Sequence, residues 1–93
     1  MNTTEKITGK TASGFEYELD PDVFDDWDIV TMFKRAYNGD EYAFVDIYPA
    51  VLGEEQFERL RDHVRTPDGR VKTSAVNAEV NEIFGAVKEA KKS

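Results

Sequence analysis

The sequence predicts a mainly α fold, in which a short N-terminal β-hairpin or strand is followed by four to five short helices in a small bundle. Two observations support this class. Between residues 15 and 19, apolar side chains alternate with glutamates, which is the period of a half-buried strand. Beyond residue 25, apolar side chains recur at the helical period, and these stretches are separated by stop signals at Asn38, Gly39 and Gly53.

The chain of 93 residues is long enough for one domain and too short for two independent cores. We expect residues 1–12 to form a mobile N-terminal arm or one strand of a hairpin. Residues 13–93 are expected to form a single small, mainly helical domain. In the hairpin alternative, Ile7 and Thr8 pair with the strand at residues 15–19. A two-stranded hairpin is marginal alone, so it must pack on the rest of the chain.

Local signals set the expected bounds of the helices. Asp20, Pro21 and Asp22 are typical of a helix start, because aspartate caps a helix and proline suits its first position. Pro49 lacks a backbone donor and should kink or break the second helix. We expect four main helices, over residues 26–37, 40–52, 54–65 and 75–88, with the end at residues 88–93 frayed.

The charge is distributed unevenly along the chain. The net charge is −7, but residues 1–58 hold 14 acids and 4 bases, whereas residues 59–93 hold 5 acids and 8 bases. Nine of the 11 aromatic residues lie between residues 15 and 48. An acidic first half argues against nucleic acid as a ligand, because phosphate binding needs clustered Lys and Arg. No apolar stretch approaches the length of about 20 residues that a membrane span requires.

The aspartates between residues 20 and 28 raise the question of a metal site. A calcium loop that begins at Asp20 would need glycine at its sixth position and a carboxylate at its twelfth. Those positions hold Asp25 and Thr31, so the pattern does not fit. Helix capping and the helix dipole account for these acids instead. We therefore expect no bound metal and no cofactor.

The sequence contains no recognisable catalytic constellation. It has no cysteine, which excludes a cysteine nucleophile and a thiolate metal site. His63 is the only histidine and lies beside Asp62 on a charged helix face, where a solvated side chain is the usual outcome. No base for a serine nucleophile is evident, and no spacing singles out a pair among the 19 acids. We expect a protein that is not an enzyme.

The most informative segment is the second expected helix, because apolar side chains cover nearly all of its circumference. Either it is a central core helix, or one side of it meets a partner or another copy of the chain. In the second case, we expect apolar contacts with a partner from Trp27, Tyr42, Phe44, Ile47 and Tyr48. The opposite charges of the two halves either attract copies head to tail or are simply solvated.

The order of the motifs resembles one family of assembly factors. The motifs that carry the resemblance are SGFEYELD (13–20), VFDDW (23–27), NGD (38–40), LGEEQ (52–56), LRDHVR (60–65), DGRV (68–71) and VNEIF (80–84), followed by a Lys-rich end. From residue 13 onward, the set is similar to the tail assembly chaperones of long-tailed (siphovirus-type) phages or prophages of Gram-positive bacteria. The resemblance rests on the ordered set, since each motif alone is a turn or an amphipathic helix.

This resemblance implies a non-catalytic chaperone that binds the tape measure protein, a long and largely helical chain, and promotes assembly of the tail-tube protein around it. It also implies a location in the host cell cytoplasm, absence from the mature virion, and self-association in some members. Members are often made in two lengths by translational frameshifting. The family supplies no catalytic residues and no fixed contact motif. The alternative is an acidic inhibitor that mimics nucleic acid, against which the basic stretch at residues 59–72 argues.

Overall fold

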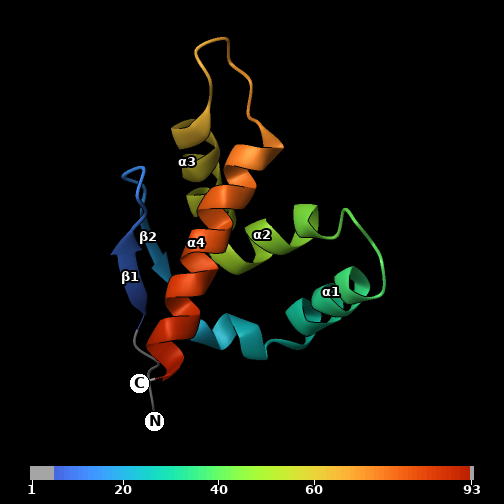
Figure 1. The fold of residues 1–93 in the computed structure, drawn as a ribbon. Coiled ribbons are helices and arrows are strands. Elements are labelled where there is room, and N and C mark those ends of the chain that lie inside the picture. The colour runs from blue at the N-terminus through green and yellow to red at the C-terminus, as the bar shows by residue number, and fades with distance from the viewer. Residues whose placement is uncertain (1–5, 93) are drawn as a thin grey trace.

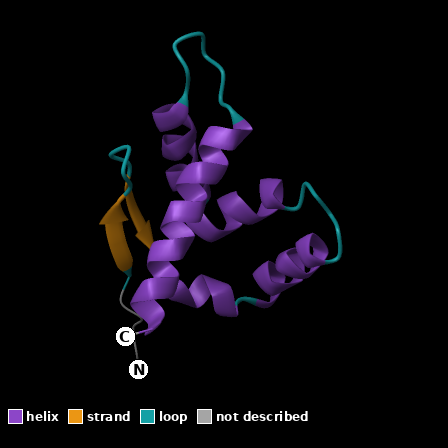
Figure 2. Ribbon diagram, viewed as in Figure 1, coloured by secondary structure: helices purple, strands orange, loops and turns teal. Residues whose placement is uncertain are grey.

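The computed structural model describes residues 6–92, and their side chains up to residue 89. Two strands lead into a short 3₁₀ helix and then into four α-helices (Figures 1 and 2). The elements are β1 (Ile7–Lys10), β2 (Glu16–Leu19), η1 (Pro21–Asp25), α1 (Trp27–Tyr37), α2 (Phe44–Leu52), α3 (Glu54–Val64) and α4 (Thr73–Lys92). The prediction of a mainly helical chain with an N-terminal hairpin is therefore confirmed.

The hairpin follows the alternation seen in the sequence. Strands β1 and β2 are antiparallel, with Ile7 opposite Leu19. Tyr17 and Leu19 are buried, while Glu16 and Glu18 face solvent. Residues 7–10 thus adopt the hairpin alternative. The first five residues of the predicted arm lie outside the described residues.

Aspartates begin two helices as expected. The Asp20 carboxylate accepts a hydrogen bond from the Asp22 amide at 2.9 Å and caps η1. Asp26 caps α1 by accepting from the amide of Asp28 at 2.8 Å. An aspartate at such a position satisfies amide groups that have no partner within the helix.

Three predicted helix bounds are wrong. The second helix begins at Phe44 rather than at residue 40, because the Asp40 carboxylate accepts from the Tyr42 amide and holds residues 41–43 in a turn. Helix α2 then runs through Pro49 to Leu52, so the predicted break does not occur. Helix α4 begins at Thr73, two residues early, and extends to Lys92, beyond the predicted end at residue 88.

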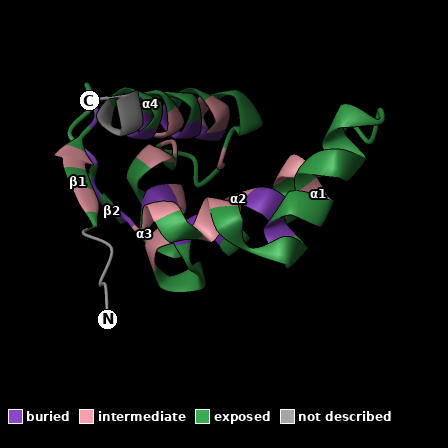
Figure 3. Ribbon diagram, turned by 90° about the horizontal axis from the view of Figure 1, so that it is seen from below, coloured by how far each residue is buried: buried purple, intermediate pink, exposed green. Residues whose placement is uncertain are grey.

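The core lies where the hairpin, α2, α3 and α4 meet. Its most completely buried side chains are Leu19, Leu60, Val80 and Ile83. They come from β2, α3 and α4. These elements are far apart in the sequence, but β2 and α3 both lie beside α4 (Figures 1 and 3). Burial of these apolar side chains is the main term that stabilises a small domain.

Helix α1 stands apart from this core. It packs mainly on α2 and η1, and projects away from the hairpin, α3 and α4 (Figures 1 and 3). Of its 11 residues only Ile29 is buried. The packing of all helices into one small bundle is therefore not confirmed. Among residues 6–92, no helix is both long and apolar enough to cross a bilayer.

Candidate functional site

Six aromatic rings form a continuous series across four elements, which we call the aromatic row. Each ring centroid lies 5.6–6.3 Å from the next. In order, the members are Phe33 of α1, Phe24 of η1, Phe84 of α4, Tyr48 and Phe44 of α2, and Tyr42 just before α2. Rings at such separations attract one another through offset and edge-to-face contacts. The row thus links the projecting helix α1 to the body of the protein.

The aromatic row is open to solvent at both ends. Phe33 is 37% exposed and Tyr42 is 74% exposed, whereas the four rings between them are half-buried. Val45, which directly follows Phe44 in α2, is also exposed. A contiguous exposed apolar surface is a common mark of a protein interaction site.

Two hollows adjoin the row. One, of about 310 Å³, lies between Phe24, Phe33 and Phe84 and is bordered by Lys88. The other, of about 150 Å³, lies among α2, α3 and the start of α4. Its apolar lining consists of Phe44, Val45, Tyr48, Phe57, Val71 and Val76. Hollows of this size can accept single side chains of a partner.

Tyr48 occupies a fixed position in the middle of the row. Its hydroxyl donates a hydrogen bond to Oδ1 of Asn77 on α4 at 2.7 Å. Burial of the ring raises the pKa of Tyr48 above its ordinary value. A tyrosine hydroxyl is protonated at neutral pH, and the raised pKa extends this donor form to more alkaline pH.

Arg35 holds the end of α1 against α2. Its guanidinium lies 3.0 Å from a carboxylate oxygen of Asp46 and 3.3 Å from one of Asp40. The hydrogen bonds to Asp46 and then to Asp40 raise the pKa of Arg35. The pair of contacts orients α1 relative to the row through side chains that remain largely solvated.

The structure separates the five residues that the sequence singled out. Tyr42, Phe44 and Tyr48 lie together in the row. Trp27 is 81% exposed at the start of α1, and within the described part of the chain no ring contact joins it to the row. Ile47 is 3% exposed and belongs to the core. We therefore correct the prediction for Ile47, because a core side chain offers no surface to a partner.

Three members of the row were not predicted as site residues. Phe33 and Phe84 lay on the apolar faces of their expected helices, and Phe24 lay in a short turn. Helical periodicity identifies an apolar face but not the element that this face meets. The sequence signal that pointed toward these rings was the concentration of aromatic residues between residues 15 and 48, which includes Phe24 and Phe33 but not Phe84.

A second cluster of polar side chains joins the hairpin turn to α3 and α4. Glu79 of α4 is buried and accepts from Thr11 Oγ1 at 2.7 Å and from Ser13 Oγ at 2.8 Å. Ser13 Oγ also lies 2.9 Å from Nε2 of His63 on α3. His63 is exposed, as predicted, but its contact with Ser13 spans 50 positions, and no local pattern signals it.

This cluster does not have the arrangement of a catalytic triad. In a triad, the carboxylate holds the histidine and the histidine takes the serine proton. Here the serine directs its proton to the carboxylate of Glu79. The contacts instead satisfy a buried carboxylate and fasten the hairpin to α4, which is a structural role.

Comparisons of the chain with protein-family models, curated proteins and solved structures found no match. Across residues 6–92, no group of three or more His, Asp or Glu side chains is placed to hold a metal ion. The aromatic row is therefore the feature on which we base a function.

Proposed function

We propose that this chain is a non-catalytic phage tail assembly chaperone that binds the tape measure protein and promotes tail-tube assembly. The observation that supports the proposal most strongly is the aromatic row, which a small fold leaves open to solvent at Phe33 and Tyr42. The ordered motifs of the sequence support the identity of the family. In this proposal the protein acts in the host cell cytoplasm and leaves before the virion is complete.

The chemistry of the row suits an amphipathic helical partner. Such a helix presents apolar side chains at intervals of three and four residues along one face. In this proposal the hollows beside the row take apolar side chains of that face, while Phe44 and Tyr48 supply flat apolar contact. The net charge of −7 keeps a protein with this exposed surface soluble.

The inhibitor alternative receives less support from the same structure. A mimic of nucleic acid needs one extended acidic face. Residues 59–72 contribute five bases to the surface near the α3–α4 loop, and Arg35 forms ion pairs with both Asp40 and Asp46. Five of the 19 acids lie at residues 20–28, and the other 14 are spread along the rest of the chain among its 12 bases.

The test is co-purification with the tape measure protein encoded in the same phage or prophage. We compare Tyr42→Asp with the matched control Tyr37→Asp, because both tyrosines are highly exposed and only Tyr42 belongs to the row. A charge in the middle of an apolar contact is costly to bury. We expect Tyr42→Asp and Phe44→Asp to reduce the recovered tape measure protein at least about tenfold, and Tyr37→Asp to leave it within about twofold.

Circular dichroism and a thermal melt establish that each variant is folded before its binding is interpreted. Equal recovery with the folded Tyr42→Asp and Phe44→Asp variants would exclude the row as the binding surface. If the wild-type protein recovers no tape measure protein, the proposed function itself is wrong.

A further inference from the structure

Each of the two hollows beside the aromatic row has a single charged residue in its lining, and in both cases it is a base. In the hollow of about 150 Å³, which we call the smaller hollow, this residue is Arg61 of α3. In the hollow of about 310 Å³, the larger hollow, it is Lys88 of α4. Within the described part of the chain no carboxylate lines either hollow, although acids outnumber bases by 19 to 12 in the sequence. The linings thus have the opposite charge to the protein as a whole.

Lys88 forms no ion pair with the residues that the structure describes. It lies near the end of α4, and its side chain is exposed. The ion pairs formed among residues 6–89 all involve other bases. Lys88 therefore places a positive charge beside the rings of Phe24, Phe33 and Phe84, which line the same hollow, and this charge is available to a carboxylate of a partner.

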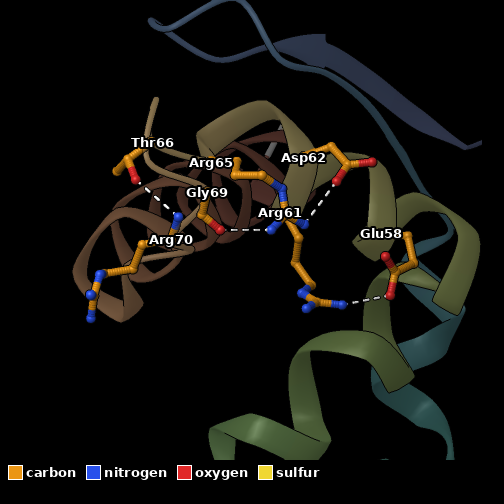
Figure 4. Close-up of polar contacts among 7 residues, drawn as sticks. All are labelled: Glu58, Arg61, Asp62, Arg65, Thr66, Gly69 and Arg70. Atoms are coloured by element: carbon orange, nitrogen blue, oxygen red, sulfur yellow. Dashed lines mark hydrogen bonds and ion pairs between the residues drawn. The ribbon is translucent and has the colours of Figure 1, made fainter.

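Arg61 is only partly engaged (Figure 4). Its Nη1 donates a hydrogen bond to Oε2 of Glu58 at 2.6 Å, and the described residues give it no other hydrogen bond. A guanidinium has five N–H donors, so the edge formed by Nε and Nη2 is available for a bidentate contact with a second carboxylate. The existing pair is largely exposed, and exposed pairs contribute little to stability. A partner carboxylate can therefore bind Arg61 without disturbing the fold.

The two hollows lie along the same side of α4. Thr73 and Val76 line the smaller hollow, whereas Phe84 and Val87 line the larger one. Each residue of the first pair is followed 11 positions later by a residue of the second pair, and this spacing makes about three turns of an α-helix. The hollows are therefore about 17 Å apart along α4. A helical partner segment of about 15 residues that runs along this side is long enough to reach both.

Charge at long range and charge at the hollows favour different partners. The net charge of −7 attracts a basic segment from a distance. At about 0.1 M salt, however, the Debye length is about 10 Å, so charges farther away than this are largely screened. The aspartates of η1 and of the start of α1 lie outside both linings. The contact charges of Arg61 and Lys88 should therefore decide which segment binds.

We propose that the segment that binds the aromatic row is an acidic amphipathic helix. Its apolar side chains enter the hollows, while aspartates or glutamates at the border of its apolar face pair with Arg61 and Lys88. A segment with lysine or arginine at those places meets like charge and is rejected. This inference rests on the proposed function, because it specifies which part of the tape measure protein is recognised: an apolar helical face with an acidic border.

Two synthetic peptides provide the first test. Both have about 18 residues, enough for five helical turns, and carry the same leucines on one face. One has glutamates on both borders of that face, and the other has lysines. The fluorescence anisotropy of each labelled peptide, titrated with the purified full chain at about 0.1 M salt, gives its dissociation constant. We expect the glutamate peptide to bind at least about tenfold more tightly.

Tighter binding of the lysine peptide, equal binding of the two, or no binding of either would overturn the inference. None of these results decides the proposed function, which depends on recovery of the tape measure protein from the same phage or prophage. Conversely, a wild-type protein that binds the glutamate peptide but recovers no tape measure protein would refute that function and leave the preference of the surface in place.

Charge reversal then assigns the preference to the two bases. Arg61→Glu with Lys88→Glu should weaken binding of the glutamate peptide at least about tenfold and strengthen binding of the lysine peptide. The matched control is Lys34→Glu with Arg70→Glu, which changes the net charge equally but alters two exposed bases outside both linings. Figure 4 shows that the side chain of Arg70 points away from Arg61 and Glu58. The control should change either dissociation constant less than about threefold.

Circular dichroism establishes that each variant is folded before its binding is interpreted. If the reversed variant does not fold, because a new carboxylate lies beside Glu58, Arg61→Gln with Lys88→Gln takes its place. This neutral variant should reduce the preference for the glutamate peptide to less than about threefold. Equal effects of the two double charge reversals would show that net charge, rather than the lining of the hollows, selects the partner, and would contradict the inference.

Discussion

Helices α1 and α4 differ sharply in what holds them. In α4, Val76, Val80, Ile83 and Val87 are all buried against the hairpin, α2 and α3. In α1, the buried side chain is Ile29, while Trp27, Val30, Phe33 and Tyr37 are exposed. The fold therefore does not use most of the apolar side chains of α1. In the proposed function, these exposed side chains serve binding rather than stability.

The attachments of α1 are also of a different kind. Ile29 enters the core, Met32 packs against its edge, and Arg35 forms two ion pairs that remain largely solvated. Such contacts give a segment a lower local stability than the core. A segment with this property can adjust its position when a partner binds, while the hairpin and α4 remain in place.

The largest expected effect comes from a cavity in the core. Leu60→Ala removes a completely buried side chain of α3. It should lower the free energy of unfolding by about 2–5 kcal/mol, measured by urea denaturation. The control Val30→Ala truncates an exposed residue of α1 and should change this free energy by less than about 0.5 kcal/mol. Similar losses in both variants would remove the distinction between α1 and the core.

A smaller effect is expected at the cluster that fastens the hairpin. Thr11→Val keeps the shape of the side chain but removes the donor to the buried carboxylate of Glu79. The free energy of unfolding should fall by about 1–3 kcal/mol in the same experiment. Thr31→Val is the control, because Thr31 is exposed and its hydroxyl donates within its own helix. Equal effects of the two changes would contradict a structural role for the cluster.

Loss of Arg35 should affect α1 without affecting the core. Arg35→Ala removes the contacts to Asp40 and Asp46, so the amides of residues 29–37 should exchange with deuterium several-fold faster. Exchange in α4 should not change. Lys34→Ala is the control, since that neighbour forms no ion pair within the described residues. Faster exchange throughout the protein would mean that α1 is coupled to global unfolding.

The smallest effect concerns alkaline pH. Burial raises the pKa of Tyr48, so the folded protein keeps this hydroxyl protonated at pH values where the unfolded chain ionises it. The free energy of unfolding should therefore fall as the pH rises above about 10. Tyr48→Phe should make this decline shallower. An unchanged alkaline profile in Tyr48→Phe would show that the ring is not buried as described.

Local patterns in the sequence predicted the elements but not their arrangement. The alternation up to Leu19 and the caps at Asp20 and Asp26 depend on neighbouring residues alone, and these predictions are confirmed. The start of α2 was wrong because the side chain of Asp40 competes with the helix for a backbone amide. Both groups are close in the sequence, but the helix propensities of these residues do not show whether the amide of Tyr42 bonds to the Asp40 side chain or joins the helix.

The surface was harder to predict, because exposure depends on contacts between distant parts of the chain. An apolar circumference in α2 was compatible with a core helix or with an interface. The structure buries Ile47 and exposes Tyr42 on the same segment. The separation of α1 from α4, and the rings of Phe24 and Phe84 that link them, follow from tertiary packing that periodicity does not encode.

The most direct test of the account is a hydrogen-exchange comparison of the free protein and its complex with the tape measure protein. If the aromatic row is the binding surface, amides of residues 24–48 should exchange at least about tenfold more slowly in the complex, because the partner then covers the row and restrains α1. The hairpin, which holds no member of the row and lines neither hollow, should show no change. Protection confined to the hairpin, with none at α1, at α2 or around Phe84, would contradict the claim that the row binds the partner.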